Sequence, residues 1–403
     1  MKTAGIICEY NPFHRGHYGH IKKTRQALSD YTGNEINRDT AIVCVMSGNY
    51  VQRGDFAILN KQARAKMALQ SGADLIVELP AVYALQSAEG FAKAGVFILD
   101  RLGICQYLSF GSESGDINKL NDAADAIISE RANTLTKEWL STGISYASAQ
   151  QKAADTLLGK ESGIFRSPNN VLGIEYIKAL KKIGSTIIPI TMERTGGDHD
   201  SDTGFSASAL RKSFIHENIP AQQMTVPAVS IAMEELASGR GPVSMEKAEL
   251  LLLSRLRAIE DYSAVPGISE GLERRFKRYA SYEVSISSII EKVKTKRYPM
   301  SRLRRILMCA ALGIKIEDAK TQPPYARVLA MNQKGIELLK IAGERAKLPI
   351  IIKPAAVNKL CELSVRIFNL EAMATDFYVL AYTSEKERTG GQEWRQSPLI
   401  INP

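Results

Sequence analysis

Cysteine pairs, long apolar runs and an acidic excess are all lacking in this chain of 403 residues. Its five cysteines, at positions 8, 44, 105, 309 and 361, form no Cys-x-x-Cys pair. Such scattered thiols fit a reducing compartment better than a disulfide framework or a zinc knuckle. No apolar run approaches the roughly 20 residues that span a bilayer, and the first residues, MKTAGIICEYNPFH, turn polar too early for a signal peptide. These absences predict a cytoplasmic protein without a membrane partner.

Charge is present in excess and is unevenly placed. Hydrophobic residues make up 45% of the chain, enough for a sizeable core, and the length favours two or three domains. Residues 1–219 hold 24 basic and 23 acidic residues, whereas residues 220–403 hold 28 and 20. The net charge is therefore +1 in the first part and +8 in the second. This asymmetry suggests that one part performs chemistry and the other holds a polyanion.

The first half alternates between short apolar runs and helical patterns. We expect strands at Thr3–Cys8, Ala41–Met46, Asp74–Leu79, Cys105–Phe110 and Thr186–Ile190. Near-continuous apolar runs are typical of strands buried on both faces of a parallel sheet, with helices between them as crossovers. Residues 133–158 interrupt the alternation and predict an inserted helical hairpin. The fold class is thus α/β, with a Rossmann-like parallel sheet.

After Pro220 the pattern becomes mostly helical. Helices are predicted over 228–259, 271–296, 301–313, 332–346 and 355–370, with proline residues marking the breaks. Short strands are expected only near Leu348–Lys353 and Asp376–Tyr382. We place a boundary near 218–227, which gives a nucleotide-binding domain over 1–220 and a mainly helical basic domain over 221–403.

The richest stretch for chemistry, EYNPFHRGHYGH (9–20), follows the first predicted strand and holds three of the five histidines. In an open α/β sheet, ligands bind at the carboxyl end of such a strand. The start of a helix near Gly16 would offer free N–H groups to an anion. A zinc-binding face made by His14, His17 and His20 is an alternative, as is a set of surface histidines, but the turn with Pro12 and Gly16 favours a phosphate site.

A second motif, FSASALRK (205–212), opens a helix after the fifth predicted strand. Ser206 is a natural N-cap, and Arg211 one turn further could reach phosphate oxygens in bidentate fashion. Alone, this pattern also fits a well-capped surface helix. Between the two motifs, the polar residues Asp198, His199 and Asp200 predict a loop rather than a metal site.

HRGH (14–17) and SASALR (206–211) resemble the two signatures of the nucleotidylyltransferases related to class I aminoacyl-tRNA synthetases. Longer blocks resemble one family more closely, the bacterial tRNA(Met) cytidine acetate ligases: GIICEYNPFHRGHYGH, SGNYVQRGD, MALQSGADLIVELP, FGSES, SPNNVLGIEY and YPMSRLRRILMCAALGI. The resemblance implies an enzyme that activates acetate with ATP as acetyladenylate. It would then acetylate N4 of the wobble cytidine of elongator tRNA(Met).

The resemblance also implies roles for individual residues. His14, His17 and Arg211 would act on the triphosphate during catalysis. The implied ATP-binding residues are Ile7, Cys8, Glu9, Tyr10, Asn11, Pro12, Phe13, His14, Arg15, Gly16, His17, Tyr18, Gly19, His20, Gly111, Asn169, Asn170, Arg194, Ser206 and Ser208. Asn169 and Asn170 could equally cap a helix beside Pro168. The Ser47–Asp55 loop fits two interpretations equally: a loop that holds acetate or the tRNA end, and a glycine-rich segment that only connects two elements.

Adenylation of this kind needs positioning and charge neutralisation more than acid–base help, because nucleophile and leaving group are both anionic. Histidines, helix N-termini, Arg211 and Mg²⁺ carried with the triphosphate would supply these, and no protein metal site is expected. The stretch 271–305 holds eleven basic and three acidic residues. Within it, the residues expected to grip tRNA are Arg274, Arg275, Arg278, Lys294, Lys296, Arg297, Arg302, Arg304 and Arg305. Tyr279, Tyr282 and Tyr298 could stack on bases, although such a run is also compatible with a solvated face.

Two other functions fit parts of the sequence. One is an adenylyltransferase for a small cofactor precursor, which the large basic part argues against. The other is an RNA-binding protein that senses ATP without catalysis. The sequence leaves open whether two copies of the chain form a homodimer.

Overall fold

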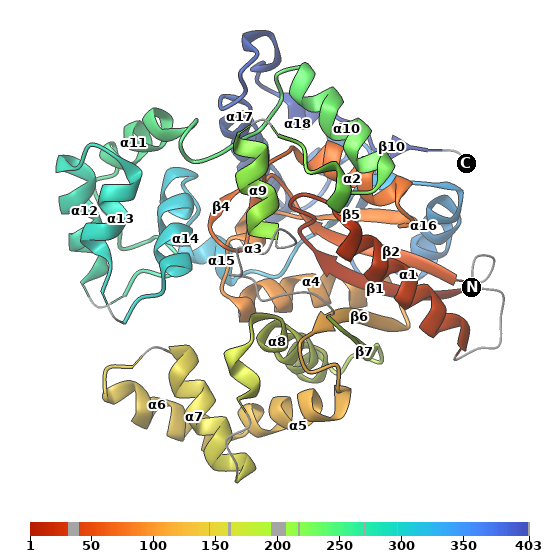
Figure 1. The fold of residues 1–403 in the computed structure, drawn as a ribbon, viewed down its shortest axis with the longest axis horizontal. Coiled ribbons are helices and arrows are strands. Elements are labelled where there is room, and N and C mark those ends of the chain that lie inside the picture. The colour runs from red at the N-terminus through yellow and green to blue at the C-terminus, as the bar shows by residue number, and fades with distance from the viewer. Residues whose placement is uncertain are drawn as a thin grey trace.

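A single eight-stranded sheet runs through the centre of the computed structural model, with helices packed on both faces (Figure 1). The structure describes residues 1–30, 40–144, 146–159, 163–194, 207–216, 218–269, 271–295 and 297–401. Its strands are β1 (Lys2–Cys8), β2 (Thr40–Ser47), β5 (Leu75–Leu79), β6 (Tyr107–Ser112), β7 (Ile188–Glu193), β8 (Ala326–Met331), β9 (Ile350–Ile351) and β10 (Leu399–Ile400). The order across the sheet is β10-β8-β5-β2-β1-β6-β7, and β9 pairs with β8.

The sheet is parallel except where β8 joins β5. β1 pairs with β2 from Lys2↔Thr40 to Cys8↔Met46, and β6 pairs with β7 from Tyr107↔Ile188 to Ser112↔Glu193. β5 and β8 run antiparallel. All eight residues of β2 are buried, as expected for a central strand covered on both sides. Parallel pairing brings the carboxyl ends of β1, β2, β6 and β7 to one edge of the sheet.

The helices of the first half connect these strands and cover both faces. They are α1 (Arg15–Asp30), α2 (Lys61–Gln70), α3 (Ala81–Ala84), α4 (Ala88–Leu102), α5 (Ile117–Ile128), α6 (Glu130–Ser141), α7 (Tyr146–Leu158), α8 (Pro168–Ile183) and α9 (Ala207–Ile215), with a 3₁₀ turn, η1, at Ile164–Arg166. One core lies under α1 and α2, where Ile21 and Met67 meet Ile42 and Met46. The other lies under α4 and α8, where Phe91 and Ile174 pack near Val45.

Most predicted elements of the first half are confirmed, with shifted ends. Each of the five predicted strands matches one of β1, β2, β5, β6 and β7, and the interrupting segment forms the α6–α7 hairpin. The Ser47–Asp55 segment contains a small antiparallel hairpin that was not predicted, formed by β3 (Tyr50–Val51) and β4 (Asp55–Phe56). The α/β class is confirmed.

The second half is largely helical, as predicted. Its helices are α10 (Val226–Ala237), α11 (Glu249–Arg257), α12 (Leu272–Tyr282), α13 (Ile286–Val293), α14 (Met300–Ala311), α15 (Ile316–Lys320), α16 (Gln333–Arg345), α17 (Glu362–Val379) and α18 (Gln392–Arg395), with 3₁₀ turns η2 (Ala221–Gln223), η3 (Pro354–Lys359) and η4 (Glu385–Glu387). Helices α11–α14 pack against one another beside the sheet (Figure 1) and are called the helical unit below.

Two expectations for the second half are wrong. The strand expected at Asp376–Tyr382 is the end of α17 and the turn after it, because the apolar residues there lie on the buried side of a helix. Residues 326–331 form a strand, β8, whose side chains are all buried and which extends the first-half sheet. The predicted boundary near 220 therefore does not leave residues 221–403 as one separate helical unit.

Candidate functional site

The sheet order reverses between β1 and β6, so the chain leaves these neighbouring strands toward opposite sides. Such a switch point opens a crevice at the carboxyl ends of the strands, where α/β proteins bind ligands. β1 ends at Cys8 and β6 at Ser112. The segment Glu9–His14 leads from β1 into α1, and its residue Tyr10 has a positive φ of 48°. Backbone in this region is uncommon outside glycine and concentrates at functional sites.

His14 and His17 form one unit at the start of α1. Their rings stack with centroids 3.7 Å apart and an angle of 28° between the planes. The His14 N–H donates to Nδ1 of His17 at 3.3 Å, and the Gly16 N–H donates to Nδ1 of His14 at 3.0 Å. A Cβ on Gly16 would lie 2.8 Å from the His14 ring, so a glycine at this position lets the ring fold over the helix start.

These hydrogen bonds determine what the two rings can do. A neutral imidazole whose Nδ1 accepts a hydrogen bond carries its proton on Nε2 and is a donor there. Burial, with His14, Arg194 and His20 nearby, lowers the pKa of His17 well below its usual value. Both rings thus carry a proton on Nε2 beside the N-terminus of α1, where the partial positive charge of the helix also favours an anion.

His20 has a different role from the other two histidines. Its Nε2 lies 2.9 Å from the hydroxyl of Ser109 on β6, and Ser109 lies 2.7 Å from the hydroxyl of Thr24. Thr24 donates its own proton to the His20 carbonyl, so Ser109 donates to Thr24 and accepts from His20. His20 therefore ties α1 to β6. Burial, together with Arg194 and Lys23, lowers its pKa to about 4.

Glu9 follows β1 directly and connects the crevice to the β3–β4 hairpin. Its Oε1 accepts a hydrogen bond from the Gln52 N–H at 2.6 Å. The carbonyl of the same Gln52 accepts from Arg305 of α14 at 3.2 Å. A Cβ on Gly54 (φ +76°) would lie 2.3 Å from the Arg305 backbone nitrogen, so the hairpin and α14 approach as closely as two backbones can. The segment Ser47–Asp55 thus borders the crevice and joins it to the helical unit.

Arg64 fixes the floor of this region and was not predicted as a site residue. Its side chain is fully buried and donates to the carbonyls of Leu59, Glu9, Ser47 and Gly48. Among the described residues its hydrogen-bond partners are all carbonyls, and it therefore holds together the carboxyl ends of β1 and β2. In the sequence it stands in KQARAKMALQ, where an arginine looks like part of a solvated helix face.

The second motif reaches the first one. Arg211 of α9 donates to the carbonyl of Asn11 at 3.0 Å and to the hydroxyl of Ser208 at 3.1 Å. Glu9, Arg53, Asp55 and Arg304 lie close enough to influence its charge. The structure thus brings Arg211 to the crevice mouth beside the Glu9–His14 segment. Ser206, and with it Asp198, His199 and Asp200, lie outside the described residues.

Gly111 and Arg194 meet across the ends of β6 and β7. A Cβ on Gly111 would lie 3.0 Å from Cγ of Arg194, so this side chain lies over the glycine. Asn169 and Asn170 lie at the start of α8, where Glu113 accepts from both of their backbone N–H groups, at 3.3 and 2.9 Å. The Asn170 side chain in turn accepts from the Ser114 N–H. Asn169 and Asn170 thus lie in the first turn of α8, and it is Glu113 that caps this helix.

The other residues of the first segment shape the turn more than its open side. Ile7, Tyr10, Asn11, Pro12 and Phe13 are buried, and Cys8 is half-buried. The Tyr10 hydroxyl lies 3.4 Å from Cys44, and the Asn11 side chain accepts from the Ile58 N–H at 2.7 Å. Arg15 donates to the Met224 carbonyl. Tyr18 is exposed, and Gly19 has open space beside it.

Comparison with known proteins agrees with this geometry. Residues 1–393 match the family model described as HIGH Nucleotidyl Transferase. The chain is 38% identical to the tRNA(Met) cytidine acetate ligase of Acetivibrio thermocellus, with 100% of both chains covered. It is also 38% identical to that of Caldanaerobacter subterraneus subsp. tengcongensis, over 95% of this chain and 96% of the relative. This chain belongs to the tRNA(Met) cytidine acetate ligase family.

Solved structures of this family share the whole fold. The chain matches Thermotoga maritima TmcAL bound with alpha-thio ATP with a TM-score of 0.90 at 32% identity, and covers 100% of both chains. The apo form of that protein matches with a TM-score of 0.92 at 31% identity, again over both full chains. The predicted family, fold and enzyme class are confirmed by these matches.

For a member of this family, the basic residues of 271–305 fall into two groups. Arg274, Arg278 and Lys294 are exposed, the Arg274 side chain by 92%. Tyr282, exposed by 79%, lies at the end of the same helix as Arg274 and Arg278. These side chains are free to meet a polyanion.

The second group is engaged inside the protein. Arg275 donates to the Lys292 carbonyl, and Arg302 donates to Gly267 and lies over the ring of Tyr298, which is itself buried. Arg304 lies 3.9 Å from Asp55, and burial lowers the pKa of Arg305 to about 10. Arg304 and Arg305, which were expected to grip tRNA, thus contact the hairpin beside the crevice. Lys296 lies outside the described residues, Arg297 is half-buried, and Tyr279 lies under Arg278.

A second concentration of charge is buried below the crevice. Lys61 contacts Glu78, Glu371 and Glu393 at 2.6, 3.2 and 2.7 Å, and Arg327 pairs with Glu78 and Glu393. Among the described residues these three glutamates form the one group spaced to hold a metal ion. Their oxygens already face two cations, so the arrangement fits an internal ion network that ties α2, β5, β8, α17 and α18 together.

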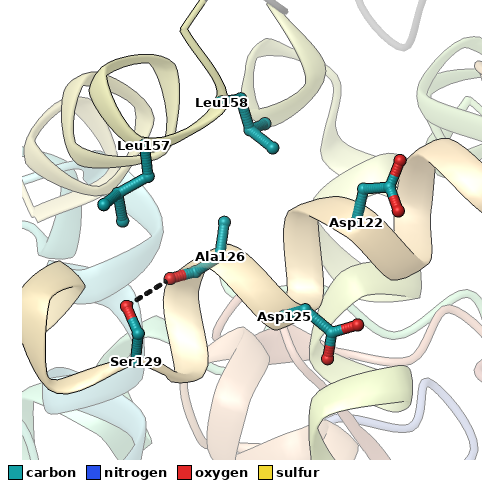
Figure 2. Close-up of a pocket in the computed structure, with 6 residues that line it drawn as sticks. All are labelled: Asp122, Asp125, Ala126, Ser129, Leu157 and Leu158. Carbon is teal, nitrogen blue, oxygen red and sulfur yellow. Dashed lines mark hydrogen bonds between the residues drawn. The ribbon is translucent and has the colours of Figure 1, made fainter.

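A separate pocket lies between α5 and α7 (Figure 2). It is lined by Asp122, Asp125, Ala126, Ser129, Leu157 and Leu158. Ser129 donates to the Ala126 carbonyl, and Asp125 pairs with Lys181 on the surface. None of the crevice residues lines this pocket.

In the described part of the chain, no helix is long and apolar enough to cross a membrane.

Proposed function

We propose that this chain is an ATP-dependent acetate ligase that forms acetyladenylate and acetylates N4 of the wobble cytidine of elongator tRNA(Met). The observation that carries the proposal is the stacked His14–His17 pair at the sheet's switch point. Two Nε2–H donors lie there beside the N-terminus of α1. The alpha-thio ATP complex of the similar T. maritima protein supports ATP as the nucleotide.

In the first step, an acetate oxygen attacks the α-phosphate of ATP and pyrophosphate leaves. Charge accumulates on the phosphate oxygens as the new P–O bond forms, and the Nε2–H groups of His14 and His17 stabilise it. Donors fixed in advance act most strongly where charge develops. Both rings are held by backbone N–H groups, so they need no reorganisation during the reaction. Arg211, anchored on Asn11, neutralises the leaving pyrophosphate.

Mg²⁺ fits this site as a companion of the triphosphate rather than as a resident of the protein. Mg²⁺ keeps most of its waters and usually needs only one or two carboxylates beside substrate phosphates. The triphosphate and water would hold the ion here, since Glu113 already uses both carboxylate oxygens to cap α8. The ion would add positive charge at the pyrophosphate.

The exposed basic face of α12 and α13 supplies the tRNA contact in this proposal. Arg274, Arg278 and Lys294 would meet backbone phosphates, and Tyr282 would offer a ring for stacking. Arg304 and Arg305 lie between this face and the crevice. They would meet RNA only near the hairpin, where the acceptor base must approach the activated acetate.

The direct test is incubation of the purified protein with ATP, ¹³C-labelled acetate and elongator tRNA(Met), followed by mass spectrometry of the nucleosides. The proposal expects labelled N4-acetylcytidine at the wobble position, together with AMP and pyrophosphate. Unmodified cytidine under conditions in which ATP and tRNA both bind would overturn it. A tRNA with the wobble cytidine replaced by uridine serves as the control.

A further inference from the structure

The second half of the proposed reaction releases a proton, and the crevice must supply a group to take it. When N4 of cytidine attacks the acetyl carbonyl, the new N–C bond forms and the C–O bond to the adenylate phosphate breaks. AMP leaves with the electron pair, and N4 loses one of its two protons. The hydrogen bonds of the histidines and carboxylates around the crevice show which of these groups could accept the proton.

The histidines that serve the first step are unsuited to this one. In both His14 and His17, Nδ1 accepts a backbone N–H, so the proton stays on Nε2 and no lone pair faces the crevice. His20 is bound to Ser109 through Nε2 and has a pKa of about 4. His20 is therefore committed to the link between α1 and β6.

The nearby carboxylates differ in which of their oxygens are already engaged. Glu113 uses both oxygens to cap α8. Asp55 accepts from the Phe56 N–H and faces Arg304. Glu9 uses only Oε1, for the Gln52 N–H, and its Oε2 accepts no hydrogen bond from any of the described residues. It is also the residue that follows β1 at the switch point.

We propose that Glu9 is the general base that accepts the N4 proton during acetyl transfer, an inference that rests on the proposed function. The Gln52 N–H holds the carboxylate in place through Oε1 and leaves Oε2 to receive the proton, which then passes to water. Burial raises the pKa of Glu9, while the Gln52 N–H and Arg211, Arg53 and Arg64 oppose this rise. A raised pKa makes this carboxylate a stronger base than an exposed one.

The position of Glu9 also links the base to the tRNA side of the molecule. The N–H of Gln52 donates to Glu9, and the carbonyl of Gln52 accepts from Arg305. The hairpin that aims the base is thus braced by α14 of the helical unit. This arrangement places the base between the nucleotide and the surface that would hold the RNA.

The experiment measures the two half-reactions separately in the Glu9→Gln variant. Glutamine keeps an oxygen for the Gln52 N–H but is not a base. Acetate-dependent pyrophosphate exchange without tRNA reports the first step. Single-turnover transfer from preformed acetyladenylate to tRNA reports the second. We expect transfer to fall by at least about 10²-fold more than exchange, the usual contribution of a general base. Glu9→Asp, which restores a carboxylate, should recover part of the loss.

The pH profile and a control complete the test. In the wild type, transfer should rise with pH as Glu9 ionises and then level off, and this limb should vanish in Glu9→Gln. Glu193→Gln, an exposed carboxylate at the end of β7, should affect neither step selectively. An equal fall in both half-reactions, or an unchanged pH limb, would overturn the inference. A wild-type protein that catalyses no exchange would instead overturn the proposed function.

Discussion

The crevice and the buried ion network lie close together along the sheet, yet they handle charge in opposite ways. In the network, Lys61 and Arg327 face three glutamates that no solvent reaches. In the crevice, His14 and His17 are fixed through Nδ1 by backbone N–H groups and carry a proton on Nε2. In the network, charges are neutralised by other side chains of the protein, whereas in the crevice the backbone fixes polar rings that can donate to an anion.

The largest effect should come from breaking the network at its centre. Lys61→Met leaves Glu78, Glu371 and Glu393 short of a cation, and such uncompensated buried charge costs about 3–5 kcal/mol. Denaturant unfolding should show that loss in the free energy of unfolding. The matched control is Lys66→Met on the same helix, whose pair with Glu234 is exposed and should contribute less than about 1 kcal/mol. Equal effects of the two variants would show that the network does not carry the fold.

The crevice should respond to mutation with a loss of rate rather than of stability. His17→Ala removes one donor to the α-phosphate, which typically costs about 10²–10³ in rate. Acetate-dependent pyrophosphate exchange should fall by that factor, with the unfolding midpoint close to that of the wild type. His216→Ala, at an exposed residue that directly follows α9, serves as control. A His17→Ala protein with near-normal turnover would remove this residue from the mechanism.

Charge reversal on the exposed basic face should alter only the RNA interaction. The triple variant Arg274→Glu, Arg278→Glu and Lys294→Glu should weaken tRNA binding and flatten its salt dependence by about 0.7–0.9 in slope for each lost phosphate contact. Pyrophosphate exchange without tRNA should persist. Lys340→Glu, Lys359→Glu and Lys386→Glu make the same charge change at other exposed positions. If both triple variants bind tRNA with the same affinity, the α12–α13 face is only a solvated surface.

The smallest expected effect is a difference between the two regions in how their contribution to the free energy of unfolding depends on pH. His20 is uncharged in the folded protein down to about pH 4, whereas the unfolded side chain takes up a proton below its usual value of 6.5. Its contribution to stability is therefore complete above that value and is lost as the pH falls. Glu371, whose pKa burial and Glu78 raise to about 7, has the opposite slope. In His20→Asn, stability relative to the wild type should rise by about 2 kcal/mol between pH 7 and pH 5. Denaturant unfolding at both pH values measures this, and a constant difference would contradict it.

Structural features that depend on residues close together along the chain could be predicted from the sequence. The apolar run before Glu9 and the Asn-Pro turn after it are sufficient to place β1, the turn and α1. Contacts between distant segments leave no such local pattern. The hydrogen bond from Arg305 to the Gln52 carbonyl joins residues 253 positions apart. The approach of α14 to the crevice therefore appears only in three dimensions.

The buried cations and β8 escaped prediction for a related reason. Lys61 and Arg64 stand in a stretch whose charges suggest a solvated helix, and only the carbonyls and glutamates brought by other elements explain their burial. The short run Ala326–Met331 is an equally good piece of helix or strand until β5 offers it an edge.

We expect the crevice between β1 and β6 to activate acetate with ATP before any RNA is bound. The decisive measurement is exchange of labelled pyrophosphate into ATP in the absence of tRNA. Exchange that depends on acetate is the expected result. Exchange that is independent of acetate, as expected of an adenylyltransferase for another substrate, would contradict it. So would ATP binding without any exchange, as expected of a non-catalytic sensor.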